Sequence, residues 1–200
     1  IKGIGPHFAK KLVKAFGEDV FDVIETEPDR LLKLDGLGPK RVERITSGWS
    51  DQKAIREIMV FLQSHGVGTS RAVRIYKTYG ADAIPLVSEN PYRLARDIKG
   101  IGFKTADLVA EKLGIEKTAM IRARAGISYT LTEAISDGNC ALPEADLLPA
   151  AEKLLEIPTD ILRDALQQEL QDETVIADTI EDQRCIFLSH LWHAERAIAG

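Results

Sequence analysis

The stretch Ile98-Lys99-Gly100-Ile101-Gly102-Phe103-Lys104-Thr105-Ala106-Asp107-Leu108-Val109 decides the fold, because it restates the beginning of the chain, Ile1-Lys2-Gly3-Ile4-Gly5-Pro6-His7-Phe8-Ala9-Lys10-Lys11-Leu12. Both copies contain Gly, an aliphatic residue and Gly, then an alanine six positions after the first Gly and an aliphatic residue at nine. Two further copies, with Val42 or Ala72 at six, begin at Gly36 and Gly66. Internal self-similarity is the signature of a repeat architecture, so the chain contains four related units.

The four units form two pairs. Gly3 and Gly66 are 63 residues apart, and Gly36 and Gly100 are 64 apart, so the duplicated element is a pair of units. Residues 1–50 hold the first pair and residues 64–117 the second, and Phe16-Gly17 and Tyr79-Gly80 end corresponding helices. Residues 51–63 carry apolar side chains at helical spacing, which predicts a connecting helix.

Each Gly-x-Gly turn has the chemistry of an anion site. Glycine supplies positive φ and lets a foreign backbone approach, because it has no Cβ. The residues that follow begin a helix, whose unpaired N–H groups and positive dipole end face the turn and can bind phosphate. The pattern resembles the helix-hairpin-helix motif, which implies sequence-independent binding of the DNA backbone. A glycine that merely ends a helix explains one copy, but four copies in register favour binding.

The candidate DNA-binding residues are the turn glycines and the cations and hydroxyls beside them. The second pair of turns offers hydroxyls and cations together. In the first pair, Pro6 removes an N–H from the first turn, and Glu43 lies among the cations of the second turn. We therefore predict that the second pair dominates binding. The full set is Gly3, Gly5, Lys10, Gly36, Gly38, Lys40, Arg41, Gly66, Gly68, Thr69, Ser70, Arg71, Arg74, Lys99, Gly100, Gly102, Lys104 and Thr105.

The net charge of −5 is divided unevenly along the chain. Residues 1–125 contain 22 Lys and Arg against 16 Asp and Glu, a net charge of +6, whereas residues 126–200 contain 4 against 15, a net charge of −11. A basic half beside an acidic half is typical of a nucleic-acid-binding region followed by a region that does not bind. Solvated helix faces alone can also produce a few charges of imbalance.

Cysteine and histidine spacing predicts no metal site. Cys140 and Cys185 have no Cys-x-x-Cys partner, and the pair His190 and His193 has no second pair, so we expect reduced thiols. No run of eighteen apolar residues and no signal-like start occurs, which predicts a cytoplasmic protein without membrane contact. Because Ile1 lies within a motif, we expect a fragment of a longer chain.

From Thr118 the pattern changes to three helices followed by two β-rich runs, which indicates a winged-helix-like module over residues 118–189. Its third helix is acidic, which disfavours phosphate binding, so the module is interpreted as structural or as a docking domain. The predicted fold is mainly α, with two tandem double helix-hairpin-helix units followed by this α+β module. The expected elements are helices at 121–136, 143–155 with Pro149 as a kink or break, and 160–172 with Thr159 as N-cap, strands at 175–177 and 185–188 around a turn at Glu181-Asp182, and a final helix beginning at 190–200.

This order of parts resembles the N-terminal region of the RecD/TraA-like ATP-dependent DNA helicases over essentially all of the chain. Besides the hairpins and the winged-helix-like segment, the final helix with Ala194-Glu195-Arg196-Ala197-Ile198-Ala199 carries the resemblance. It implies an accessory region of a 5′-to-3′ superfamily 1 helicase in repair or recombination, followed by a motor domain. Gly138-Asn139 departs from the Gly-His expected in that family.

These residues contain no motor of their own. A Walker A loop requires Gly-x-x-x-x-Gly-Lys-Ser/Thr, and in the nearest stretch Phe103 separates Gly102 from Lys104. The fragment is therefore predicted to have no catalytic residue and no cofactor, while the resemblance implies ATP and Mg²⁺ for the full-length parent. The expected partners are single-stranded, duplex or forked DNA and the parent's motor domain, and the expected state is a monomer.

Three other functions fit parts of the pattern. A helix-hairpin-helix DNA glycosylase could use Lys104 as nucleophile, but it needs an Asp about twenty residues later, where Met120-Ile121-Arg122-Ala123-Arg124 stands. A subunit that binds Holliday junctions also has paired hairpins, but only one pair per chain. A protein-interaction scaffold with vestigial hairpins remains open, although the cations retained beside the turns weigh against it.

Overall fold

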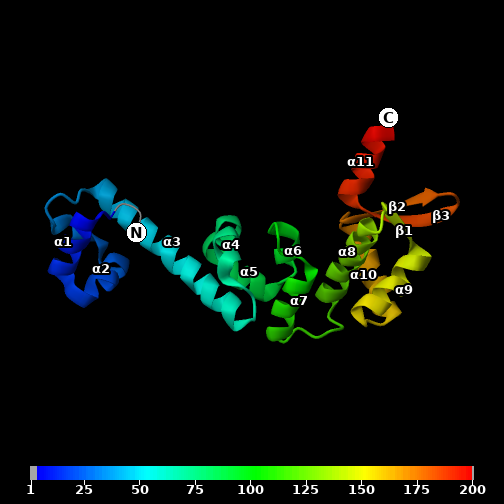
Figure 1. Cartoon of the computed structure of the whole chain (residues 1–200), viewed down its shortest axis with the longest axis horizontal. Coiled ribbons are helices and arrows are strands. Elements are labelled where there is room, and N and C mark those ends of the chain that lie inside the picture. Colours follow the sequence, from blue (N-terminus) through cyan, green and yellow to red (C-terminus); the bar gives the residue numbers. More distant parts are fainter. Residues whose placement is uncertain (1–3, 200) are drawn as a thin grey trace. The chain divides into compact units, whose positions relative to one another are not determined.

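The computed structural model describes residues 4–199, which form many helices and one small sheet (Figure 1). The chain folds as two compact units. The first contains the residues up to 64 together with 68–84, and the second contains 65–67 together with the residues from 85 onward. Helices dominate both, and the only sheet of the described part lies in the second, which confirms the predicted fold class. Within residues 4–199, none of the helices has the length and apolar character that crossing a bilayer requires.

The first unit is built from three short helices and one long one, with 3-10 turns between them. α1 and α4 each end at a glycine with positive φ, Gly17 at 59° and Gly80 at 63°, as the sequence predicts. The elements are α1 (Pro6–Phe16), α2 (Val20–Thr26), α3 (Pro39–Ser64) and α4 (Ala72–Tyr79), 3-10 turns at Gly17–Asp19, Pro28–Lys33, Thr69–Arg71 and Gly80–Asp82, and the start of α5 (Ala83–Glu89).

α3 is one continuous helix of 26 residues (Figure 1). The sequence predicts a hairpin helix up to residue 50 and a separate connecting helix at 51–63, but the chain stays helical across that point. Gly48 is the weakest helix former nearby and costs about 1 kcal/mol relative to Ala. Ile45 before it and Ile58 after it are buried, and burial of such a side chain contributes about 1.5–3 kcal/mol.

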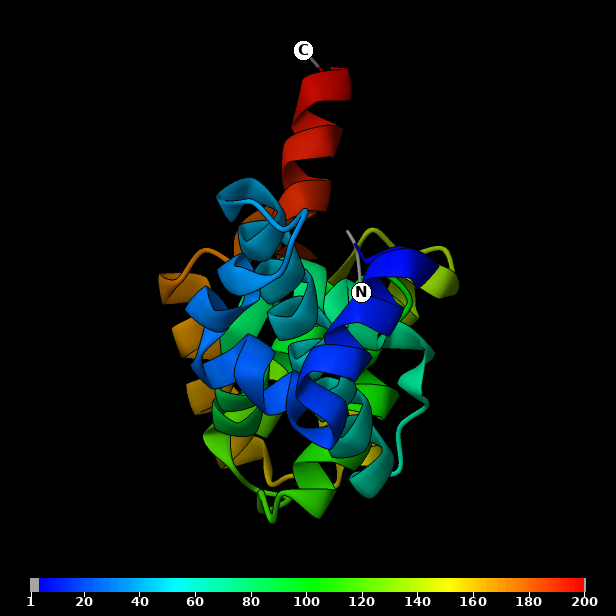
Figure 2. The same ribbon diagram turned by 90° about the vertical axis from the view of Figure 1, so that its left-hand side faces the viewer.

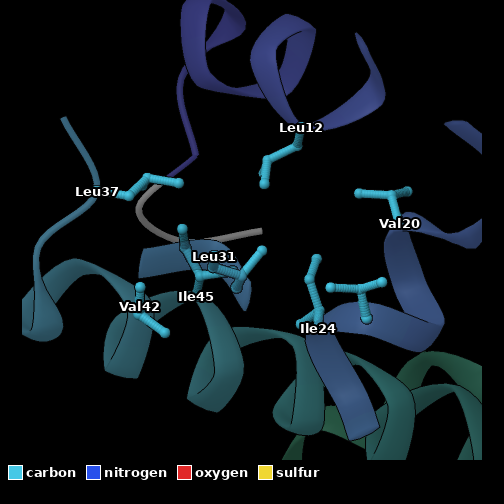
Figure 3. Packing of buried hydrophobic residues seen from close by; sticks show 8 residues of the cluster. Leu12, Val20, Ile24, Leu31, Leu37, Val42 and Ile45 are labelled. Carbon is cyan, nitrogen blue, oxygen red and sulfur yellow. The ribbon is translucent and has the colours of Figure 1, made fainter. Parts of the chain in front are cut away.

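The core of the first unit lies between α1, α2 and the first half of α3. In Figure 3, Leu12 points from α1 toward Leu31 and Ile45, while Ile24 lies between α2 and α3. Leu37, the residue between the two glycines of the second turn, belongs to the same core. Burial of this middle residue anchors the turn to the unit.

The second unit contains the last Gly-x-Gly turn and the winged-helix-like module. It includes α6 (Arg93–Asp97), α7 (Phe103–Lys112), α8 (Met120–Ser136), β1 (Ala141–Pro143), α9 (Glu144–Leu155), α10 (Thr159–Gln171), β2 (Val175–Ile180), β3 (Gln183–Leu188) and α11 (Ser189–Ala199).

The module has the predicted β-hairpin and one strand more. β2 and β3 pair antiparallel, with Val175 opposite Leu188, around a turn in which Glu181 and Asp182 have φ of 47° and 64°. Two positive φ values give the tight turn whose twist matches that of the strands. β1 pairs with the other edge of β3 and gives the order β1-β3-β2. Three residues ending in Pro143 are too short for an alternating pattern, so the sequence gives no signal for β1.

All four helix starts predicted after residue 118 are wrong by one residue, and α8 and α11 begin one residue early, at Met120 and Ser189. Pro143 closes β1, so α9 begins at Glu144 and continues through Pro149 without interruption. α10 begins at Thr159, and its N-cap is Pro158. The Thr159 hydroxyl donates to Glu152 Oε2 of α9 at 2.5 Å, so it is engaged with the preceding helix and does not cap its own.

α8 packs closely against α9 and α10. At Gly126 of α8, an added Cβ would lie 2.3 Å from Leu155 Cδ1 of α9, so glycine permits this approach. Ile127 and Leu131 of α8 are buried in the same core, together with Leu147 of α9. α11 follows β3 and extends away from the hairpin in Figure 1, and Figure 2 shows the same helix, in red, protruding at the C-terminal end.

Candidate nucleic-acid interface

The first glycine of the second, third and fourth turns is required by the backbone of the chain itself. Gly36, Gly66 and Gly100 have φ of 86°, 74° and 86°, a region that residues with a Cβ rarely adopt. The corresponding Gly3 lies outside the described residues. The residue that follows each of these three glycines, Leu37, Val67 or Ile101, is buried, so each turn is anchored inward while its glycines face solvent.

The second glycine of each turn has no such internal reason. Gly5, Gly68 and Gly102 are helix N-caps with φ of −82°, −61° and −99° and extended ψ, which any residue can adopt. A Cβ added at any of them, or at Gly38, would meet no atom of the chain within 4 Å. The fold therefore does not demand glycine at these positions. These glycines are exposed, so the space that a missing Cβ leaves open faces solvent.

The helices that follow the turns leave their N-terminal charge unneutralised. α1, α3, α4 and α7 have no acidic residue in the first turn, and the caps Gly5, Gly68 and Gly102 make no side-chain hydrogen bond to the helix start. By contrast, the first turns of α9 and α10 carry Glu144, Asp146 and Asp160. Free N–H groups and an uncompensated dipole favour an anion at the Gly-x-Gly turns and disfavour one at the module's own helices.

Two of the cations occupy equivalent positions. Lys40 and Lys104 are each the second residue of their helix, α3 and α7, and both are exposed. Each can therefore reach an anion held over the preceding turn. Lys10 lies one turn later in α1 and is also exposed.

The third turn differs from the other three. Thr69–Arg71 forms a 3-10 turn before α4 begins at Ala72. Ser70 is exposed, whereas Thr69 and Arg71 are half-buried, and Arg74 follows on the exposed surface of α4. The hydroxyls predicted beside this turn are thus carried by the tighter helix at its start.

The first and second turns are joined by an aromatic ring that the sequence analysis did not select. Arg41 Nη1 donates to the Gly36 carbonyl at 2.9 Å, and its guanidinium lies 4.4 Å from the centre of the Phe8 ring. Lys11 Nζ donates to the Asp35 carbonyl at 3.0 Å. Arg41, a predicted DNA contact, is therefore held against its own turn.

The fourth turn is held by aromatic rings. Phe103, directly after Gly102, stacks on Tyr92 with ring centres 5.5 Å apart and on Tyr129 of α8 with centres 4.6 Å apart. Phe103 is buried, whereas Lys104 is exposed. Lys99 and Gly100 on the other side of the turn are exposed as well.

Comparison with known protein families identifies two helix-hairpin-helix regions in the sequence. Residues 51–141 match the helix-hairpin-helix domain of the ATP-dependent RecD2 DNA helicases, and residues 1–51 match the SAM-like tandem helix-hairpin-helix family. The two matches together place helix-hairpin-helix domains over residues 1–141, and the second of them is of the kind found in RecD2 DNA helicases. The RecD2-type match contains the third and fourth turns and α8, and it ends where the sheet begins.

One curated relative shares this RecD-like region. The ATP-dependent RecD2 DNA helicase of Deinococcus radiodurans is 32% identical over 114 residues, which cover 57% of this chain and 16% of the relative. The match thus spans about one sixth of the relative's length.

Proposed function

We propose that the chain is a sequence-independent DNA-binding accessory region of a 5′-to-3′ superfamily 1 helicase in DNA repair or recombination. The observation that carries this proposal is the second glycine of each turn. The fold leaves a Cβ-sized space open at Gly5, Gly38, Gly68 and Gly102 and gives no reason of its own for it. A phosphate on the uncapped helix start would use that space, because it must approach the backbone N–H groups closely.

The rest of the proposal follows from the chemistry of the turns. Phosphates are common to every DNA sequence, so contacts made by N–H groups, Lys40 and Lys104 orient the chain without reading bases. ATP and Mg²⁺ would act in the parent's motor domain, which is the proposed partner within the same protein. The region would work as a cytoplasmic monomer on single-stranded, duplex or forked DNA.

The direct test is Gly102→Ala. The methyl group should block close approach of a phosphate and weaken DNA binding by about fivefold or more, equivalent to about 1 kcal/mol. Stability should stay within about 0.5 kcal/mol, because restricting the unfolded chain stabilises while alanine is a poorer N-cap than glycine. Fluorescence anisotropy with labelled duplex, single-stranded and forked DNA measures the first quantity, and thermal unfolding the second.

Ala119→Gly provides the matched control, because Ala119 is the N-cap of α8 and belongs to none of the Gly-x-Gly turns. This reverse exchange should leave DNA affinity unchanged. Undiminished affinity of the Gly102→Ala variant for all three DNA forms would contradict a phosphate at this turn.

A further inference from the structure

We propose that Arg122 is a positioning residue that fixes the fourth turn on the winged-helix-like module, so that an acidic module orients a DNA-binding element. The inference rests on the proposed phosphate contact of Lys104. Arg122 lies in the basic half of the chain, so the charge pattern alone would count it among the DNA-binding cations.

The first half of the link joins Arg122 to α7. Asp107 of α7 accepts hydrogen bonds from Arg122 Nε at 2.9 Å and Nη2 at 3.1 Å, and from the Tyr92 hydroxyl at 2.6 Å. The guanidinium and carboxylate thus pair through two parallel bonds, an arrangement that fixes orientation as well as distance. Burial and the hydrogen bond to Asp107 raise the pKa of Tyr92, so its hydroxyl stays protonated and continues to donate.

The second half joins the same guanidinium to the module. Arg122 Nη1 donates to the carbonyls of Lys117 and Leu155, both at 2.9 Å. Leu155 is the last residue of α9, where carbonyls lack helical partners and the helix dipole favours a cation. One side chain, 12% exposed, therefore connects α7, the linker after it and the end of α9.

The link acts on the same face of α7 as the aromatic stack. Phe103 and Asp107 are four residues apart and lie on one side of the helix. Phe103 packs on Tyr129 of α8 and Asp107 pairs with Arg122 of α8. Two contacts one helical turn apart restrain both the tilt and the rotation of α7, and with them the direction of Gly102 and Lys104.

The module has little use of its own for positive charge. Arg124, the other arginine of α8, pairs with Glu169 at 2.6 Å and with Asp172, both in or next to α10. Arg122 and Arg124 are therefore engaged with acidic groups inside the second unit. Removing Arg122 would take away one of the two contacts that restrain α7, and the charge that it subtracts is already paired with Asp107.

A double-mutant cycle on the 200-residue chain tests the role of Arg122. In the natural sequence, Lys104→Ala should lower affinity for a labelled duplex about fivefold. In the Arg122→Gln background the same change should cost less than about twofold, because a mobile α7 no longer holds Lys104 at the phosphate. Lys40→Ala, in the first unit, should keep its full effect in both backgrounds. Arg163→Gln, an exposed arginine of α10, removes the same charge and should leave the Lys104 effect intact.

Asp107→Asn provides an independent test, because the positioning role and simple electrostatics predict opposite changes in DNA affinity. The change makes the chain more positive, so charge alone predicts tighter DNA binding, whereas loss of the paired carboxylate predicts weaker binding and a reduced Lys104 effect. If the Arg122→Gln variant loses its helical circular dichroism signal and is unfolded, the isosteric Asp107→Asn variant tests the positioning role in its place.

The outcomes separate the two proposals. A Lys104→Ala change without effect in the natural sequence overturns the phosphate contact of the fourth turn. A Lys104 effect of equal size in the natural, Arg122→Gln and Asp107→Asn backgrounds overturns the positioning role and leaves the DNA-binding proposal standing.

Discussion

The two glycines of a Gly-x-Gly turn have different roles, although the sequence presents them as one motif. At Gly100 the positive φ of 86° excludes a side chain for reasons within the chain. At Gly102 the backbone is extended and nothing of the chain lies near an added Cβ. One glycine therefore serves folding, and the other leaves room for a ligand.

Gly100→Ala should lower the free energy of unfolding by about 1–2 kcal/mol, because alanine at positive φ is strained. For a chain of this size, the melting temperature should fall by roughly 2–8 °C. Calorimetry on Gly100→Ala and Gly102→Ala compares the two positions directly. Equal melting temperatures for both variants would show that φ at Gly100 imposes no strain.

At the level of elements, the pairing of turns leads to a comparison between the two halves. Pro6 and Pro39 begin α1 and α3 without an N–H group, whereas Thr69 and Phe103 retain theirs. Arg41 is also held against Phe8. The first pair of turns therefore has fewer donors to offer a phosphate than the second.

We accordingly expect Arg71→Ala with Lys104→Ala to weaken DNA binding more than Lys10→Ala with Lys40→Ala, by a similar factor for different DNA sequences. The three lysines are exposed, so each of their changes should alter stability by no more than about 0.5 kcal/mol, as thermal unfolding can verify. Equal losses from the two double variants would indicate a track along all four turns, and no loss from either would favour the scaffold alternative.

The contact between α11 and β2 should depend on pH. Asp178 of β2 accepts a hydrogen bond from Trp192 Nε1 of α11 at 2.8 Å. This bond, the Thr179 backbone N–H and Arg196 lower the pKa of Asp178. A lowered pKa means that the stabilisation is present above the usual Asp range near 3.9 and is lost as the pH falls through the folded-state value.

Trp192 fluorescence can follow this change in a Trp49→Phe variant, since the chain has two tryptophans. Emission should shift to the red as acidification releases the indole. The Asp178→Asn variant should lack that transition, and an identical acid transition in both proteins would rule out Asp178 as its source.

Local sequence signals predicted most elements, and contacts between distant residues account for what was missed. Phe16-Gly17 and Tyr79-Gly80 end helices through glycine backbone, which a sequence displays directly. β1 exists only because β3 pairs with it, and Thr159 is diverted by Glu152 seven residues earlier. In the site, the sequence motif displays the glycines directly, but two of the partners of Arg122, Asp107 and Leu155, lie 15 and 33 residues away, where no spacing rule applies.

For the whole chain, the net charge of the basic half overstates the positive charge that is available to bind DNA. The +6 of residues 1–125 includes Arg122 and Arg124, and both are paired inside the second unit. The anion-binding features that remain are concentrated at the turns. Binding should therefore scale with the number of turns engaged and less with net charge.

If each of the four turns neutralises about one phosphate, affinity for duplex DNA should fall about a hundredfold between 50 and 200 mM salt. Titrations at several salt concentrations give the slope of log affinity against log salt, expected near −3.6. A slope near zero would contradict phosphate contacts, and a slope near −1 would mean that a single turn engages.

Because α3 is unbroken, its length fixes the rotation about the helix axis between the buried side chains at its beginning and those at its end. The helix extends about 39 Å at 1.5 Å per residue, with Ile45 buried near its beginning and Leu62 near its end. Each residue added between them would rotate one buried stripe by about 100° against the other. A single insertion at Gly48 would thus turn the later stripe away from α4, while seven residues, nearly two full turns, would return it to within about 20°. Insertions or deletions in α3 therefore preserve the packing at both of its ends only when they come close to whole helical turns.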